Sequence, residues 1–223
     1  MRPILTAALL LITAPAFAAQ GVGLSPIINN LTTTTKVATV KVLNNTSCAS
    51  PFQFQVTRWT QKDGVDVNEP TEAVRAFPPI ATIPAGGTQI VRIGRIHPAN
   101  PGVEEAYRLD VQQKEGCADK HAKPAAGPTL SLRYHLSAPI FYRNPAWTAQ
   151  LHAVWDNGVL KLRNDGKATA DIFGVTVDGQ PGRAHAIHIL PGSAVAVSTK
   201  RTARPSSVDV RTSAQDHVAL TVE

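Results

Sequence analysis

The clearest pattern in the sequence runs through Leu130-Ser-Leu-Arg-Tyr-His-Leu-Ser-Ala-Pro-Ile-Phe-Tyr-Arg143. Apolar side chains stand at every second position of this stretch, namely Leu130, Leu132, Tyr134, Leu136, Ala138 and Ile140. In an extended chain these side chains leave one face, because successive Cβ atoms point to opposite sides of a strand. The pattern therefore predicts a long strand whose apolar row is either core or a template for a strand of another chain.

Most of the remaining chain shows the same alternation in shorter runs. These runs cover residues 38–42, 52–56, 107–111, 153–154, 159–162, 173–177, 186–189, 194–197, 208–210 and 218–222. Turn signals such as Asp63-Gly64 and Asp156-Asn157-Gly158 separate them, and no stretch of ten or more residues has helical periodicity. We therefore predict an all-β fold of two sandwich domains, residues 19–144 and 145–223, with Pro145 stiffening a short joint.

The first residues predict an export signal. The apolar run Ile4–Ile12 follows a basic start and precedes Ala16-Phe17-Ala18, the small-x-small pattern that signal peptidase reads. The run is too short for a bilayer, which takes roughly 20 apolar residues, although an uncleaved anchor is the alternative. We expect residues 1–18 to be a signal peptide that is removed after Ala18.

The chain contains two cysteines, Cys48 and Cys117. In an exported protein this number favours one disulfide in an oxidising compartment. A reactive thiol pair is the alternative, but the Cys-x-x-Cys spacing that would support it is absent from the sequence.

Composition and motifs argue against several classes of function. Loss of Arg2 with the signal leaves 21 of the 22 Lys and Arg residues against 16 Asp and Glu, a net charge of +5. Basic residues are not interleaved with aromatic ones, so we predict no nucleic-acid partner. The sequence has no Gly-x-Ser-x-Gly elbow, phosphate loop or His-Glu-x-x-His motif, so we predict no enzyme, no cofactor and no small-molecule substrate. His185 and His188 would point to opposite faces of a strand, so we expect no metal site there.

Several segments together resemble the periplasmic pilus-assembly chaperones of the chaperone–usher pathway, in particular their archaic, Csu-like branch. The resemblance rests on Leu24-Ser-Pro26, Arg58-Trp-Thr-Gln61 with Asp63-Gly64, Pro78-Pro-Ile80, Pro84-Ala-Gly-Gly-Thr-Gln-Ile-Val-Arg92, Glu104-x-x-Tyr107-Arg108-Leu109 and Leu130 to Arg143. The order and spacing of these segments agree across the first domain. The second domain offers only generic strand patterns and Leu162-Arg-Asn-Asp-Gly166.

The resemblance implies two immunoglobulin-like sandwiches in a boomerang arrangement and a role in pilus assembly. Pilus subunits of this pathway lack their last strand, and the chaperone lays its own strand into the open groove until the subunit reaches the outer-membrane usher. The expected partners are therefore pilus subunits and the usher, and the expected location is the periplasm. On this resemblance the donor strand carries Leu130, Leu132, Tyr134 and Leu136.

The resemblance also assigns charged residues. Glu104 and Arg143 match the positions of a structural ion pair near the domain junction. Typical members anchor the client's terminal carboxylate with an Arg on the first strand and a Lys on the donor strand, but Pro26 and Pro139 stand in these places. The substitutes that we consider are Arg92, Arg108 and Arg133. A guanidinium suits a carboxylate, although each of the three can equally be a solvated charge on a strand face.

The alternative function is that of a structural or adhesive surface protein with immunoglobulin-like domains. An assembled pilus subunit would carry an N-terminal extension with the alternation of a donor strand. Residues 19–23 are too short and too small for such an extension, so we expect a chaperone.

Overall fold

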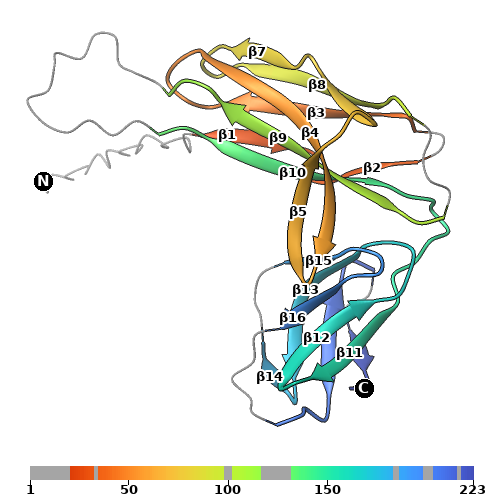
Figure 1. Ribbon diagram of the computed structural model, residues 1–223. Helices are drawn as coiled ribbons and strands as arrows, with labels where there is room; N and C mark the ends of the chain where they lie inside the picture. Colours follow the sequence, from red (N-terminus) through yellow and green to blue (C-terminus); the bar gives the residue numbers. More distant parts are fainter. Residues whose placement is uncertain are drawn as a thin grey trace, which may run out of the picture.

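The computed structural model describes residues 21–32, 35–97, 102–116, 132–182, 186–197, 203–214 and 217–223. The regular secondary structure in these ranges consists of β-strands, which form two sandwich domains that meet at an angle (Figure 1). The predicted all-β fold is thereby confirmed. Within the described ranges, no helix is long and apolar enough to cross a membrane. The predicted signal peptide, Leu130 and Cys117 lie outside the described residues.

The first domain contains β1 (Val22–Ser25), β2 (Asn29–Leu31), β3 (Val37–Asn44), β4 (Ser50–Lys62), β5 (Val65–Pro70), β6 (Val74–Phe77), β7 (Ile80–Ile83), β8 (Thr88–Arg95), β9 (Glu105–Gln113) and β10 (His135–Tyr142). One sheet has the order β1-β3-β8-β6, and the other has the order β2-β10-β9-β4-β5 with β7 paired to β4. Alternate residues of these strands, such as Val40, Phe52 and Leu109, fill one core between the sheets. The runs predicted at residues 38–42, 52–56 and 107–111 are the inward faces of β3, β4 and β9.

The second domain contains β11 (Leu151–Asp156), β12 (Val159–Asn164), β13 (Ala170–Val177), β14 (Gln180–Pro181), β15 (Ile187–Ile189), β16 (Ala194–Val197), β17 (Val208–Thr212) and β18 (Val218–Leu220). Its sheets have the orders β11-β12-β16 and β14-β13-β17-β18, with β15 paired to β13. The boundary predicted between residues 144 and 145 falls in the connection from β10 to β11, and its position stays a prediction.

One predicted alternation is wrong. The run at residues 173–177 places Phe173 on the buried face together with Val175 and Val177, but Phe173 is 39% exposed and Ile172 is buried instead. The pairing of β13 with β17 shifts between Ile172 and Gly174, which indicates a β-bulge. The extra residue moves the inward face by one position, and a period-two pattern does not reveal such an insertion.

Both domains contain a buried asparagine that fixes a turn to a neighbouring strand. In the first domain, Nδ2 of Asn44 donates to the carbonyl oxygens of Cys48 and Ile83, each at 2.9 Å. In the second domain, Nδ2 of Asn164 donates to the carbonyl oxygen four residues later, at 2.8 Å, and to that of Ile189 at 2.9 Å. Asn164 is the centre of the Leu162-Arg-Asn-Asp-Gly166 motif, so this motif has a structural role. We call each turn that is fixed by a buried asparagine a corner.

A long hairpin of β4 and β5 leaves the first sandwich and reaches the second (Figure 1). Its turn is Asp63-Gly64, with φ angles of 52° and 78°, the conformation of a tight two-residue hairpin. A Cβ on Gly64 would lie 3.1 Å from the carbonyl oxygen of Ala194. The tip of the hairpin therefore lies directly against the second domain.

Candidate functional site

The apolar row of β10 passes from the core of the first domain into solvent. Ala138 and Ile140 have no exposed surface, and Leu136 packs partly against the core. Tyr134 is also half-buried, whereas Leu132 is 64% exposed. The row is therefore core at one end and an accessible apolar surface at the other, and the role of the accessible end as a template for another chain stays a prediction.

Beside this row, β10 has an open hydrogen-bonding edge. The strand pairs with β9 along its whole length, His135–Tyr142, but with β2 only over Ile140–Tyr142. The first part of β10 thus lies at the edge of its sheet, with no described strand on its second side.

The register decides which backbone groups point to that edge. The Gln113 N–H donates to the Tyr134 carbonyl oxygen at 2.9 Å, so even-numbered residues of β10 bond to β9. In an antiparallel ladder the alternate residues, His135 and Ser137, direct their N–H and C=O groups to the other side. Pro139 follows in the same series, and because its nitrogen faces the open side, it removes no hydrogen bond to β9.

An aromatic cluster joins the two domains. Trp59 of β4, Ala106 of β9 and Phe141 of β10 form a buried cluster with Leu190 of the second domain. The ring centroids of Trp59 and Phe141 are 6.0 Å apart, and Trp59 meets the ring of His188 edge-on at 5.6 Å. The outer face of this sheet is therefore covered by the second domain at the junction.

A buried ion pair lies in the same junction. Nε of Arg143 is 2.8 Å from Oε2 of Glu104, whose side chain has no exposed surface. Oε1 of Glu104 accepts hydrogen bonds from the Thr169 N–H at 3.1 Å and from the Thr169 hydroxyl, and the Glu104 N–H donates to the Lys167 carbonyl oxygen at 3.0 Å. Burial raises the pKa of Glu104, although Arg143 and Thr169 act in the opposite direction. Glu104 thus bonds the first domain to the second.

The three candidate arginines do not lie together. Arg92 is exposed on β8 in the other sheet, beside Phe77 and Ile96. Arg133 is exposed just before β10. Arg108 of β9 stands directly opposite Pro139 in the ladder, so the two side chains share the outer face of the sheet.

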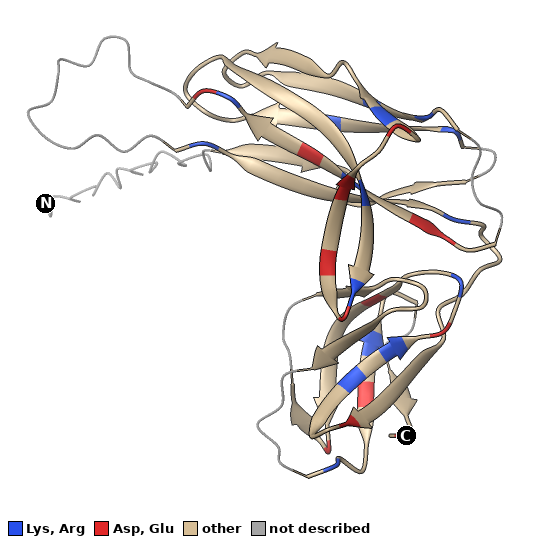
Figure 2. Ribbon diagram, viewed as in Figure 1, with Lys and Arg blue, Asp and Glu red and all other residues tan. Residues whose placement is uncertain are grey.

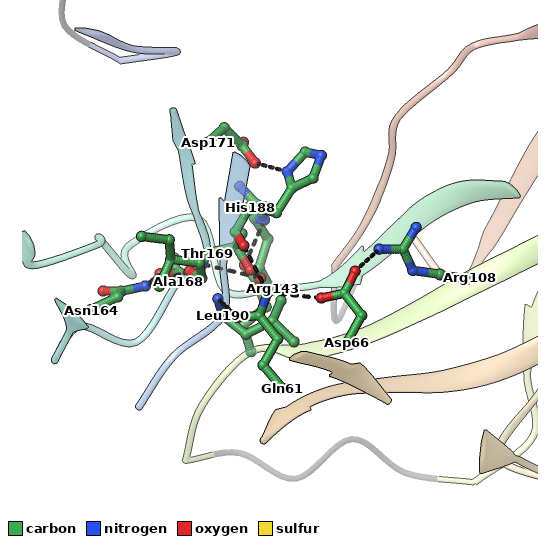
Figure 3. A network of polar contacts seen from close by, with 12 residues as sticks. Gln61, Asp66, Arg108, Arg143, Asn164, Ala168, Thr169, Asp171, His188 and Leu190 are labelled. Carbon is green, nitrogen blue, oxygen red and sulfur yellow. Dashed lines mark hydrogen bonds and ion pairs between the residues drawn. The ribbon is translucent and has the colours of Figure 1, made fainter. Parts of the chain in front are cut away.

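Arg108 is also the arginine that the junction holds in place. Its guanidinium carbon lies 3.9 Å from the centroid of the Trp59 ring, and Nη2 is 2.7 Å from Oδ2 of Asp66 on β5 (Figure 3). Across the described residues, basic and acidic residues are interspersed along the strands and loops of both domains and form no single stripe (Figure 2).

Sequence reasoning missed the residues that connect the hairpin to the second domain. Nε2 of Gln61 donates to the His188 carbonyl oxygen at 2.8 Å, and Oε1 of Gln61 accepts from the Leu190 N–H at 3.0 Å. Gln61 ends the motif Arg58-Trp-Thr-Gln61, but the motif gives no sign that the backbone of another domain lies opposite. Nothing in the sequence pointed to a role for Asp66 except its position shortly after the Asp63-Gly64 turn.

Cys48 is disulfide-bonded. Because Cys117 lies outside the described residues, the predicted pairing of the two cysteines stays a prediction. Among the described residues, no group of three or more His, Cys, Asp and Glu side chains is placed to hold a metal ion.

A comparison with protein families assigns the chain. The profile described as "Pili and flagellar-assembly chaperone, PapD N-terminal domain" matches residues 22–147, more than half of the sequence. The chain belongs to this family. The pilus-chaperone family predicted from the motifs of the first domain is thereby confirmed.

Solved structures of pilus chaperones have the same fold. A chain in the CsuC–CsuE chaperone–tip adhesion subunit pre-assembly complex, from archaic chaperone–usher Csu pili of Acinetobacter baumannii, is 19% identical with a TM-score of 0.72, covering 91% of this chain and 99% of that chain. The E. coli chaperone DraB is 17% identical with a TM-score of 0.66, covering 92% and 96%. The complex of the Salmonella enterica SafA pilin with the SafB chaperone gives 18% identity, a TM-score of 0.65, and coverages of 92% and 97%. The comparison with curated protein sequences found no match.

Proposed function

We propose that this pilus chaperone caps pilus subunits in the periplasm by adding to them the segment Leu130–Leu136, which leads into the first part of its β10 strand. The observation that carries the proposal is the combination of an accessible apolar row and an open backbone edge on the same strand segment. A client that lacks its last strand needs both, because backbone hydrogen bonds hold the added strand and alternate side chains fill the groove. The donor residues of this proposal are Leu130, Leu132, Tyr134 and Leu136.

The exposure of Leu132 sets the scale of its contribution to binding. Full burial of a leucine side chain is worth about 1.5–3 kcal/mol. Since Leu132 is 64% exposed in the free chaperone, its burial in a client would contribute about 1–2 kcal/mol. Several such side chains can hold a client without ATP hydrolysis, and covering the client's open edge also prevents its aggregation.

Arg108 is the candidate that we propose as the anchor of the client's terminal carboxylate. It lies across the ladder from Pro139, the position at which typical members carry the anchoring Lys. Adjacent strands are about 4.8 Å apart, so an arginine on β9 can serve a ligand that arrives along β10. Arg133 is the second choice because it is exposed next to the donor segment, and Arg92 is the weakest because it belongs to the other sheet.

The remaining parts of the proposal concern location and delivery. We infer that residues 1–18 direct export, that Cys48 pairs with Cys117 in the oxidising periplasm, and that the client passes to an outer-membrane usher by strand exchange. The Glu104–Arg143 pair holds the angle between domains 19–144 and 145–223 in this proposal. The chaperone–subunit complexes of CsuC with CsuE and of SafB with SafA support pilus subunits as the class of client.

Co-expression with a pilin encoded beside this gene tests the proposal. Leu132→Asp should abolish co-purification of the pilin, because a carboxylate cannot enter an apolar groove without a large desolvation penalty. Ile80→Asp is the matched control, since Ile80 is 60% exposed on β7, away from the donor segment. Recovery of equal amounts of pilin with both variants would show that β10 is not the donor strand.

A further inference from the structure

In this structure Arg108 already holds a carboxylate from its own chain. Nη2 of Arg108 lies 2.7 Å from Oδ2 of Asp66, and the two side chains are 20% and 42% exposed. They come from β9 and β5, which lie on either side of β4 in one sheet, so the contact reaches across β4 (Figure 3). Arg108 is therefore paired before any client arrives.

The guanidinium of Arg108 is held in place, and Asp66 satisfies it only in part. It stacks on the ring of Trp59 at 3.9 Å, which sets the plane of the group. Nε of Arg108 is buried and has no hydrogen-bond partner among the described residues. A carboxylate that binds an arginine in a bidentate manner uses two parallel N–H groups, whereas Asp66 leaves the Nε donor without a partner.

A second group keeps Asp66 in place from the other side. Nε2 of Gln61 is 3.0 Å from Oδ1 of Asp66, and the same nitrogen donates to the His188 carbonyl oxygen at 2.8 Å. Oε1 of Gln61 accepts from the Leu190 N–H, so the amide is held by the second domain. Because of this bond, Asp66 can leave Arg108 and still keep one hydrogen-bond donor.

We propose that Asp66 is an internal counter-ion that occupies Arg108 in the free chaperone and is displaced by the terminal carboxylate of the client. The inference rests on the proposed function, in which Arg108 receives that carboxylate. Two carboxylates at one guanidinium repel each other, so the client must compete with Asp66. The competition lowers affinity for every client and favours release at the usher, while it spares the free chaperone an unpaired, partly buried cation.

Competition between tagged chaperones for a limiting amount of unfolded pilin tests this role. A half-exposed ion pair is worth about 0.2–1 kcal/mol, so Asp66→Asn should bind about 1.5- to 5-fold more pilin than the wild type in the same tube. Asp66→Ala should show the same gain in bound pilin. This second variant keeps the test valid if Asp66→Asn does not fold. Glu69→Gln removes the same charge from the same hairpin, on the other face, and should give equal shares.

The source of the gain is tested with a second pilin that carries two extra residues after its native C-terminus. Its carboxylate no longer reaches Arg108, so the advantage of Asp66→Asn should disappear, and Arg108→Gln should lose affinity only for the native pilin. Equal shares of native pilin for Asp66→Asn and wild type, or a gain that persists with the extended pilin, would overturn the role of Asp66. Failure of the wild type to bind any pilin would instead overturn the proposed function.

Discussion

Replacement of Asn164 by alanine should destabilise the second domain severely. The side chain makes four hydrogen bonds to the backbone: Nδ2 donates to Ala168 and Ile189, and Oδ1 accepts from the N–H groups of Gln150 and Gly166, at 2.8, 2.9, 3.1 and 3.0 Å. Each such bond contributes about 0.5–1.5 kcal/mol net, so the loss of all four should cost about 2–6 kcal/mol. The position is fully buried, so the four backbone groups would lose partners that bulk water does not reach.

This cost is large against the stability that a small domain has. A domain of roughly 80 residues unfolds with a free energy of about 4–12 kcal/mol. The variant should therefore lose about half of the stability of the second domain and unfold at a much lower urea concentration. Asn44→Ala should have a comparable effect on the first domain, because Asn44 makes the same kind of corner.

Urea unfolding followed by circular dichroism and tryptophan fluorescence measures the effect, with Trp155 of β11 as a reporter of the second domain. Asn45→Ala is the matched control, since its side chain is exposed and adjacent to the other corner. The control should unfold like the wild type within about 0.5 kcal/mol. A loss below about 1 kcal/mol for Asn164→Ala would refute the view that these amides fix the turns.

Three further outcomes are expected. Gly166→Ala should cost about 1–3 kcal/mol in the same assay, because a Cβ there would lie 2.5 Å from the Gln150 backbone nitrogen, whereas Gly94→Ala meets open space and should be neutral. Burial raises the pKa of Glu104 above its ordinary value of 4.5, so the folded state binds this proton more tightly than the unfolded state does. The unfolding free energy of the wild type, relative to that of Glu104→Gln, should therefore fall as the pH rises above about 4.5. A difference that stays constant with pH would contradict the burial argument. Burial also raises the pKa of Tyr107 to about 12, so the phenolate absorbance that Tyr107→Phe removes should develop only near pH 12 in the folded protein.

The alternation of apolar residues was enough to predict the architecture and the inward faces of most strands. Runs such as residues 38–42 and 107–111 work because one face of each strand is core and the other is exposed. The predicted burial of Phe173 was wrong because a β-bulge inserts a residue into the strand. The cost of that insertion depends on the partner strand, which the local sequence does not contain. The sandwich could thus be predicted, but not the register at its irregular points.

The candidate site was only partly predictable, since it is made of contacts between distant segments. The apolar row of β10 is local, so its pattern is visible in the sequence. The Asp66–Arg108 contact spans 42 residues, and the bonds of Gln61 to the second domain span 127 and 129. Such contacts depend on where the hairpin tip meets the other domain, and no spacing rule gives that position.

In the proposed function one strand belongs to two proteins in turn, and the segment from Leu132 to the end of β10 has two parts that suit this role. Its last residues are held on both sides, by β9 and by β2, and their side chains are core. At Leu132 the side chain is 64% exposed, so its replacement costs the chaperone little stability of its own. The free energy that this end can supply is therefore released only when a client covers it. A strand buried along its whole length could not pair with a client unless the chaperone unfolded. A strand free along its whole length would not be held in the register that the client needs.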